Sequence, residues 1–538
     1  MLAEDGYDLQ LKFGNIQTKK CVARFILDLI DFTSAYPIEH KSVLDPGCGK
    51  GVFLLETLER NFSRVLMLDI DIDLWIKNIK KLFVGYEINP ELCKEARDRV
   101  YDFLISKVGV NKSLAESVAR SIVIQGDFLK WKPEIRYDVI VGNPPYVRYD
   151  NLEGEYIRWL RDNYACFRGR SDLCIPFIQH GLELLSDKGK LAFICTNRFT
   201  LCDYGKYLRE LITKKYNITK MIDFTATKPF DTSVSTYPWI FVFQRKNHQN
   251  VLFSQVNNSD LDNSSFSTSR LNWRKIDCDY FSKAPWRIPN KDLMKLWDDV
   301  KRFNSMQLGD SEFGVSIKVG LATGADNVFI NPSTEAQIEP DLLVPFVLSS
   351  NLNNHQIHKT ELLLNTWDPN NTKKPIKLDD WPNTSKYLNE NKEKLKSRYI
   401  AKKNPARWYR LIDHLDPKLL KKKKLVFPSL RRSLEVYFDK GTCIPHHNCY
   451  YATKTSQEGP SLLVIGALLS SSIVDNLASV LAIKFNGRAS RLLKSSFLEI
   501  PMPEPKIVIE RQRELESAFL QNATDKIDTV TKELYGIT

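Results

Sequence analysis

Short apolar runs alternate with amphipathic helical stretches over the first 245 residues. Helical periodicity lies between several of the runs, as in Pro90–Val100 and Leu173–Leu185. Strands that alternate with helices in this way predict a parallel, doubly wound α/β sheet. The last run contains WIFVF and is expected near an edge of the sheet, after a hairpin. The predicted strands are Ser42–Leu44, Leu82–Glu87, Ser121–Ile124, Tyr137–Val141, Lys190–Thr196, Lys220–Phe224 and Pro238–Gln244.

The pattern changes after residue 247. Residues 248–290 are rich in Asn, Ser and Asp, which predicts a linker or surface insertion. Residues 291–510 mix helices, short strands and aromatic residues, and we interpret them as a second, α+β domain. A polar helical tail is expected over 511–538. A chain of 538 residues is too long for one core, so a division into domains is expected.

Charge is unevenly distributed along the chain. The formal net charge is +12, and the segment Ile376–Lys440 alone holds 18 Lys and Arg against 8 Asp and Glu. An excess of this kind favours an anionic partner, of which nucleic acid is the commonest. A run such as Lys421–Lys424 could equally be a solvated basic face, but the concentration in one segment favours a phosphate-binding surface.

The remaining composition argues against several protein classes. Ten cysteines occur without a CxxC pair, which disfavours a disulfide framework or a zinc ribbon and suits a reducing cytoplasm. His446 and His447 lie near two cysteines, but adjacent side chains point apart on a strand, so no metal is expected. The polar start MLAEDGYDLQ predicts no signal peptide. Polar residues interrupt the apolar stretch Leu462–Ile483, which predicts a buried helix and no membrane span.

A glycine-rich turn follows the first predicted strand. In Val43–Leu54 (VLDPGCGKGVFL), the strand ends at Asp45, and Gly47, Gly49 and Gly51 lead into an apolar helix. Glycines remove side chains where a ligand approaches the backbone, and the helix N-terminus opens at the same place. A merely tight strand–helix turn is the alternative interpretation.

Two more strand ends carry carboxylates. Glu87, in Gly85–Pro90, is placed to accept hydrogen bonds from both hydroxyls of a ribose. It follows Asp45 by 42 residues, where roughly 20 is usual, so an insertion over residues 60–82 is expected. The third strand ends at Gly126–Phe128, where Asp127 could bind an adenine amino group and Phe128 its ring.

The fourth strand leads into Asn143-Pro144-Pro145-Tyr146. This tetrapeptide resembles the (Asp/Asn/Ser)-Pro-Pro-(Tyr/Phe) motif of amino-group methyltransferases. With DPGCGKG and GYEINPE before it and a large domain after it, the chain resembles γ-class N6-adenine DNA methyltransferases of type II restriction–modification systems. The resemblance implies a Rossmann-like methyltransferase sheet over 1–247, followed by a mixed α+β target-recognition domain, with S-adenosyl-L-methionine as cofactor. The residues implied to bind the cofactor are Thr18, Asp45, Pro46, Gly47, Gly49, Glu87, Ile88, Asp127, Phe128 and Asn143.

Thr18 lies in Phe13–Arg24, which resembles the family's N-terminal cofactor motif, where it would contact the methionine end. It could at the same time cap the following helix.

The residue types of the tetrapeptide suit methylation of an aromatic amine, whose lone pair is delocalised into its ring. The side-chain oxygen of Asn143 and the carbonyl of Pro144 can accept hydrogen bonds from the two amine hydrogens and stabilise the developing positive charge. Tyr146, after Pro145, can stack on the base, which must be flipped out of the duplex. No metal is required. Phe230, in Lys228–Ser235, resembles a family position that packs on the flipped base, although a core Phe is an alternative.

The second half contains looser resemblances. Val319–Phe329 resembles the opening of the family's target-recognition region, and Trp381–Pro505 resembles the TaqI-like C-terminal specificity domain. The segment Arg148–Arg170 could be a mobile loop over the substrate or a structural insertion. The side chains expected to contact DNA are Arg148, Lys402, Lys403, Arg407, Arg410, Arg431 and Arg432.

Several alternatives stay open. The NPPY motif also occurs in methyltransferases that act on a protein glutamine or on guanine N2 in RNA, although a large basic domain downstream favours double-stranded DNA. Cytosine N4 methylation usually has Ser at the position of Asn143. Cytosine C5 methylation needs a Pro-Cys dipeptide, which the sequence lacks. An inactive DNA-binding specificity subunit is the non-enzyme alternative.

The expected partner beyond DNA is a separate restriction endonuclease, because only about a dozen residues precede the first cofactor motif. We expect a monomer. The recognition sequence cannot be derived from one chain.

Overall fold

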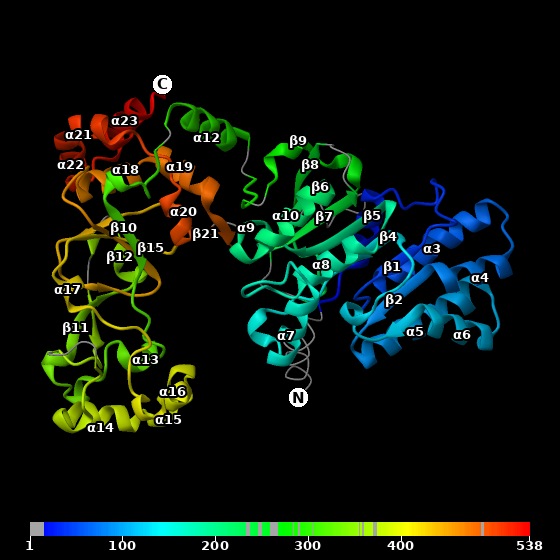
Figure 1. Ribbon diagram of the computed structural model, residues 1–538, viewed down its shortest axis with the longest axis horizontal. Helices are drawn as coiled ribbons and strands as arrows, with labels where there is room; N and C mark the ends of the chain where they lie inside the picture. Colours follow the sequence, from blue (N-terminus) through cyan, green and yellow to red (C-terminus); the bar gives the residue numbers. More distant parts are fainter. Residues whose placement is uncertain are drawn as a thin grey trace. The chain divides into compact units, whose positions relative to one another are not determined.

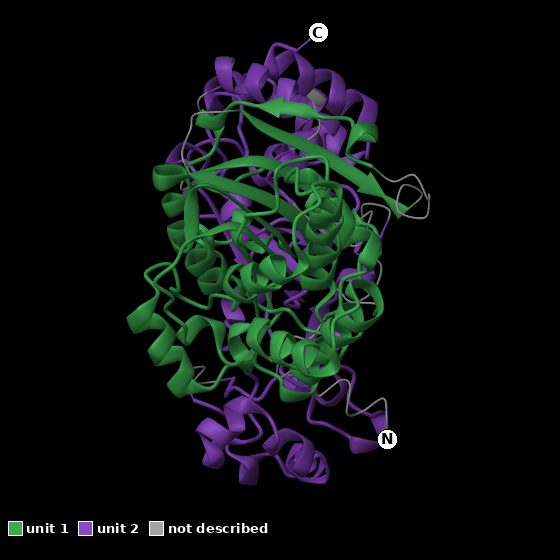
Figure 2. Cartoon of the chain, turned by 90° about the vertical axis from the view of Figure 1, so that its right-hand side faces the viewer, with its two compact units in different colours: residues 1–287 green, residues 288–538 purple. Residues whose placement is uncertain are grey.

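The computed structural model describes residues 16–232, 237–245, 250–258, 267–282, 284–288, 291–304, 306–353, 356–357, 360–369, 374–485 and 489–537. The chain forms two compact units, residues 1–287 and 288–538 (Figure 2).

A nine-stranded sheet forms the centre of the first unit, in the order β3-β2-β1-β4-β5-β7-β6-β8-β9 (Figure 1). The strands from β3 to β5 are parallel, and β7 runs antiparallel to both β5 and β6. The predicted α/β fold is confirmed, with a mixed sheet. The strands are β1 (Val43–Asp45), β2 (Phe83–Glu87), β3 (Val123–Gln125), β4 (Tyr137–Gly142), β5 (Leu185–Thr196), β6 (Tyr216–Ala226), β7 (Pro238–Arg245), β8 (Val251–Asn257) and β9 (Arg274–Ile276).

Two expectations about this sheet are wrong. The strand that contains WIFVF is β7, which lies between β5 and β6 and is buried from Pro238 to Phe243. Residues 248–290 are not simply a linker, because β8 pairs with β6 and β9 pairs with β8. The hydrophilic residues that suggested a linker lie between these two strands, partly outside the described residues.

Helices flank the sheet. The expected helices at Pro90–Val100 and Leu173–Leu185 are confirmed as α5 (Pro90–Phe103) and α8 (Cys174–Glu183). The insertion over residues 60–82 forms the end of α3 and all of α4, and the buried Trp75 of α4 donates a hydrogen bond from Nε1 to Asn61 Oδ1 at 2.7 Å. The others are α2 (Lys20–Leu29), α3 (Val52–Met67), α4 (Ile72–Leu82), α6 (Lys112–Ile122), α7 (Gly154–Asn163), α9 (Arg198–Leu201) and α10 (Lys206–Lys215).

The second unit has an antiparallel sheet in the order β10-β19-β15-β17. Its strands are β10 (Val315–Val319), β15 (Lys424–Pro428), β17 (Tyr437–Asp439) and β19 (Cys449–Lys454). The helices that share its core are α12 (Lys291–Phe303), α18 (Leu462–Leu469), α19 (Ser472–Leu481), α20 (Lys494–Leu498), α21 (Pro505–Glu510), α22 (Gln512–Leu520) and α23 (Thr524–Tyr535). The expected tail is therefore helical but not a separate part, because residues such as Leu515, Val530 and Tyr535 are buried in this core.

A second core of this unit surrounds a smaller sheet in the order β14-β11-β18. The region around this second core contains most of the basic segment Ile376–Lys440. Its elements are β11 (Leu343–Val347), β14 (Glu361–Leu364), β18 (Ile444–Pro445), α13 (Asp326–Phe329), α14 (Pro382–Glu390), α15 (Lys392–Lys396) and α16 (Tyr399–Lys403).

The apolar stretch Leu462–Ile483 folds into the largely buried helices α18 and α19, which are bent by 75° relative to each other. Among the described residues, no single helix has the length and apolar character needed to cross a membrane; only this bent pair meets that test jointly.

Candidate functional site

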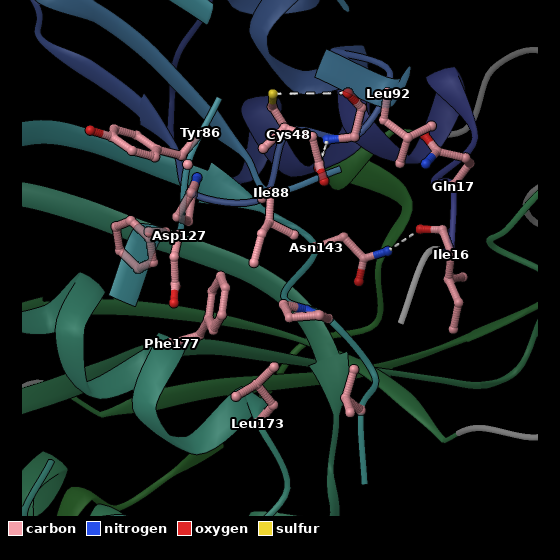
Figure 3. Close-up of a pocket in the computed structure, with 18 of the residues that line it drawn as sticks. Ile16, Gln17, Cys48, Tyr86, Ile88, Leu92, Asp127, Asn143, Leu173 and Phe177 are labelled. Atoms are coloured by element: carbon pink, nitrogen blue, oxygen red, sulfur yellow. Dashed lines mark hydrogen bonds between the residues drawn. The ribbon is translucent and has the colours of Figure 1, made fainter. Parts of the chain in front are cut away.

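A cavity of about 340 Å³ lies where β1, β2, β3 and β4 end. The carboxyl ends of parallel strands meet at one edge of a sheet, where α/β proteins bind ligands. Asp127 and Phe177 lie on one side of the cavity and Ile16 and Gln17 on the other, with Ile88 and Asn143 between them (Figure 3). The predicted residues Thr18, Pro46, Gly47, Gly49, Glu87, Ile88, Asp127, Phe128, Asn143 and Pro145 all line it.

The glycine-rich turn is shaped by backbone conformation. Gly49 has a φ of +52°, and a Cβ atom there would lie 2.8 Å from Nε2 of Gln17. Gly51, with a φ of +81°, directly precedes α3. An L side chain is strained in the left-handed region, so the turn requires glycine at both positions.

Glu87 joins this turn to the next strand end. Its Oε2 accepts a hydrogen bond from the N–H of Gly49 at 2.9 Å, and Oε1 accepts one from the N–H of Asn89 at 2.8 Å. Burial raises the pKa of Glu87, and these backbone hydrogen bonds oppose the rise. Each carboxylate oxygen keeps a further lone pair for a ligand hydroxyl.

Asp45 lies beneath the cavity and does not line it. Its side chain is fully buried, and neither carboxylate oxygen has a hydrogen-bond partner among the described residues. Burial raises its pKa well above the ordinary value, and the charge of Glu87 adds to the rise, while nearby backbone N–H groups oppose it. The role of Asp45 in cofactor binding stays a prediction.

Asp127 and Phe128 follow β3. Asp127 Oδ1 accepts a hydrogen bond from the N–H of Leu129 at 3.0 Å, and Oδ2 accepts one from the hydroxyl of Tyr156 at 2.9 Å. Phe128 is 2% exposed, and its ring centroid lies 5.2 Å from that of Phe177. Phe128 thus supports the wall mainly through packing.

The side chain of Asn143 has a fixed orientation. Its Nδ2 donates a hydrogen bond to the carbonyl of Ile16 at 2.8 Å, while Oδ1 is buried and has no partner among the described residues. Thr18 lines the same cavity and also has a buried, unpartnered hydroxyl. The Ile16–Thr18 segment is held by a bridge between Thr18 and Phe230. Phe13, Gly14 and Asn15 of the N-terminal motif lie outside the described residues.

Tyr146 and Phe230 lie next to each other. Their ring centroids are 5.8 Å apart and their planes meet at 76°. Phe230 is 4% exposed, and neither it nor Pro144 lines the main cavity. Tyr146 lines a separate pocket of about 40 Å³ together with Arg148 and other residues.

Several other residues that line the cavity were not predicted, among them Gln17, Tyr156, Leu173 and Phe177. Phe177 lies in an apolar helix, where it reads as a core residue. Tyr156 lies in α7, inside the segment interpreted either as a mobile loop or as an insertion. Only its aromatic and arginine content marked that segment.

The expected DNA contacts differ in exposure. Arg148, Lys402, Lys403, Arg407 and Arg432 are exposed. Arg410 is half-buried, and its guanidinium lies over the ring of Trp367 at 5.7 Å. The side chain of Arg431 lies outside the described residues. In the run Lys421–Lys424, the last residue is buried and ion-paired with Asp439 at 2.5 Å.

The expectation that His446 and His447 point apart is wrong. Their ring centroids are 4.0 Å apart, and ligand atoms of both rings and of Asp326 lie within 4.8 Å of one another. The N–H of Asn448 donates to His446 Nδ1 at 3.5 Å, and Nε2 lies 3.2 Å from Asp326 Oδ2. His446 Nε2 is buried and has no hydrogen-bond partner of suitable geometry among the described residues, although Asp326 lies close to it.

Comparison with known sequences gives consistent results. The model of the Eco57I restriction-modification methylase family matches residues 67–230. The type II methyltransferase M.BstVI of Geobacillus stearothermophilus is 30% identical over 97% of this chain and 96% of its own length. The type II methyltransferase M.XhoI of Xanthomonas vasicola is 27% identical over 97% of each chain.

Solved structures share the fold. The type IIL restriction–modification enzyme MmeI, solved in complex with DNA, matches with a TM-score of 0.66 and 14% identity over 96% of this chain and 73% of its own. The type ISP enzyme LlaGI, a nuclease-deletion mutant solved with a DNA substrate mimic, has a TM-score of 0.58 and 13% identity over 94% of this chain and 47% of its own. From its full-length similarity to M.BstVI, the chain belongs to the type II DNA methyltransferases of restriction–modification systems.

Proposed function

We propose that this enzyme transfers a methyl group from S-adenosyl-L-methionine to the N6 amino group of an adenine flipped out of a specific duplex sequence. The observation that carries the proposal is the orientation of Asn143, whose Oδ1 is buried without a partner at the cavity. We assign the chain to the γ class because cofactor turn, NPPY and second unit follow in that order.

The cavity fits S-adenosyl-L-methionine. Its volume of about 340 Å³ lies within the usual range of ligand pockets. The carboxylates of Glu87 and Asp127 have lone pairs left for ribose hydroxyls and an adenine amino group. The buried hydroxyl of Thr18 lacks a partner that a ligand would supply. When bound, the cofactor supplies an electrophilic sulfonium methyl group.

Asn143 and Pro144 activate the target amine. Because Nδ2 of Asn143 is held by the carbonyl of Ile16, the amide presents its oxygen as the acceptor. This oxygen and the Pro144 carbonyl accept hydrogen bonds from the two N–H groups of the amine. They thereby stabilise positive charge as it develops on nitrogen. The backbone preorganises these dipoles, so they need no reorientation during the reaction.

Tyr146 and Phe230 hold the flipped base. Their contact at 5.8 Å places two aromatic rings beside the NPPY turn. We assign Tyr146 to stacking on the base and Phe230 to packing at its edge, since Phe230 is buried.

The second unit is proposed to recognise duplex DNA, with a TaqI-like specificity region over residues 381–505. Its support is the basic segment 376–440 and the presence of DNA in the solved MmeI complex. In the cell, methylation would protect host DNA from a separate endonuclease, as the type II relatives suggest.

The test is methyl transfer from labelled S-adenosyl-L-methionine to mixed-sequence duplex DNA, followed by nucleoside analysis. The wild type is compared with Asn143→Ala and with the control Asn250→Ala, an exposed residue of the first unit that does not line the cavity. We expect N6-methyladenine from the wild type and the control, and a loss of about 100-fold or more in Asn143→Ala. Label on cytosine N4 would overturn the choice of base, and label only on RNA or protein would overturn the DNA substrate.

A further inference from the structure

The chain between the NPPY turn and α8 forms a wall of the cofactor cavity. Asn151, Leu152, Glu153 and Tyr156 line it together with residues of the parallel strands. The last of these lies in the first turns of α7, which is anchored by the buried side chains of Ile157 and Leu160. This part of the cavity wall therefore belongs to a helix that is packed against the rest of the unit.

Tyr156 contacts the residue assigned to the cofactor's adenine. Its hydroxyl donates to Asp127 Oδ2 at 2.9 Å, while the N–H of Leu129 occupies Oδ1. Burial raises the pKa of Tyr156, and the charge of Asp127 adds to the rise, so the phenol stays a neutral donor. Two hydrogen bonds from opposite sides fix the carboxylate plane and leave lone pairs for a further donor.

Other contacts connect the helix to the same short turn, Phe128–Lys130. Within α7, the rings of Tyr156 and Trp159 stack, with centroids 5.8 Å apart and planes within 6°, and this pair faces Lys130 of the turn. Lys130 Nζ lies 5.7 Å and 5.6 Å from these two ring centroids. Beyond α7, the Tyr164 hydroxyl donates to the carbonyl of Leu129 at 2.5 Å. The turn that follows Asp127 and the helix that carries Tyr156 are thus joined by several contacts.

We propose that Tyr156 is a cofactor-positioning residue, which holds Asp127 in the orientation that accepts the adenine amino group of the cofactor, and that α7 covers this end of the bound cofactor. The proposal rests on the proposed function, because it requires that the cavity binds S-adenosyl-L-methionine. Its consequence is that the bound cofactor contacts α7 and should protect this helix from opening.

Two matched variants test this. Tyr156→Phe keeps the ring stack on Trp159 and removes only the hydroxyl. Tyr164→Phe removes a hydroxyl bonded to the same turn, but Tyr164 does not line the cavity. Binding of S-adenosylhomocysteine is measured by calorimetry, and amide hydrogen exchange over residues 149–163 is followed with and without it.

We expect Tyr156→Phe to weaken binding about tenfold, the scale of a hydrogen bond to a charged group, and to raise KM for S-adenosyl-L-methionine with kcat changed less than twofold. Tyr164→Phe should bind within twofold of wild type. S-adenosylhomocysteine should slow exchange over 149–163 in the wild type and less so in Tyr156→Phe.

Equal binding by wild type and Tyr156→Phe, or equal weakening by both variants, would overturn the inference while leaving the proposed function intact. Absence of binding in the wild type would instead overturn the proposed function.

Discussion

The side-chain amide of Asn143 donates to the backbone carbonyl of Ile16 at 2.8 Å, and this bond joins the catalytic turn to the N-terminal segment that contains Thr18. An amide can bind in this way because one end donates and the other accepts. A carboxylate at the same position would place an oxygen against the Ile16 carbonyl. The bond therefore favours Asn over Asp at this position.

Asn143→Asp should slow methyl transfer by roughly 10- to 100-fold, the scale of losing a preorganised dipole, with S-adenosylhomocysteine binding within a few-fold of wild type. Single-turnover kinetics and calorimetry would measure the two effects. Asn250→Asp, at an exposed position of the first unit away from the cavity, controls for the added charge. Wild-type kinetics in Asn143→Asp would show that the hydrogen bond to Ile16 is dispensable.

Gly49→Ala should weaken cofactor binding and destabilise the first unit by about 1–2 kcal/mol, because its φ of +52° is left-handed. The added Cβ would also meet Gln17 Nε2 at 2.8 Å. Adding Gln17→Ala should relieve that collision but leave the backbone strain. Cofactor binding and stability should therefore recover only in part. Gly154→Ala, where no atom lies within 4 Å of the added Cβ, should stay near wild type. Full rescue by Gln17→Ala would mean that backbone strain contributes nothing.

Much of the cavity lining was predictable because its signals are local. A strand end, a glycine turn or the NPPY tetrapeptide each occupies a few consecutive residues, and parallel strands bring their carboxyl ends together. Phe177 and Tyr156 could not be predicted in the same way. Their helices read as ordinary amphipathic segments, and only packing decides which side chains face the cavity.

Pairing between distant strands was also beyond the sequence pattern. The apolar run in β7 is compatible with any strand that is covered on both faces of the sheet. Its position between β5 and β6 depends on pairing between segments far apart in the chain. Likewise, Lys424 reads as the fourth member of an exposed basic run. Its partner, Asp439, is 15 residues away on β17, and only the β15–β17 register brings the two together.

Asp45→Asn should stabilise the first unit at neutral pH. Burial raises the pKa of Asp45 in the folded state, so the unfolded chain ionises first as the pH rises. The contribution of this group to stability is therefore greatest below its ordinary pKa and is lost progressively above it. Melting temperatures of wild type and Asp45→Asn should diverge from about pH 4 upward, by about 2–4 °C for each kcal/mol. A constant difference across this range would contradict the assignment of the pKa shift.

Lys424→Met should destabilise the second unit by about 3–5 kcal/mol, because it leaves Asp439 buried and unpaired. Burial acts to raise the pKa of Asp439, but hydrogen bonds from Lys424 and Thr442 hold it below its ordinary value. The ion pair thus contributes stability above the ordinary carboxyl pKa and loses it as the pH falls through the lowered value. Denaturant unfolding at pH 7 measures the loss. The matched substitution Lys422→Met, at an exposed position, should change stability by less than about 0.5 kcal/mol; equal losses would mean that Lys424 is not buried in solution.

Replacing the exposed cations Lys402, Lys403 and Arg407 together by alanine should weaken binding to all duplexes and leave the order of preference among sequences unchanged. Each phosphate contact contributes about 0.9 to the slope of log affinity against log salt. Three lost contacts should therefore reduce that slope by about 2.7, measured by fluorescence anisotropy at several salt concentrations. Charge removed from the acidic α3–α4 turn, as in Asp69→Asn with Asp71→Asn, should leave the slope unchanged. If the triple variant keeps its slope but loses preference for one sequence, these side chains read bases and the phosphate-binding surface lies elsewhere in the basic segment.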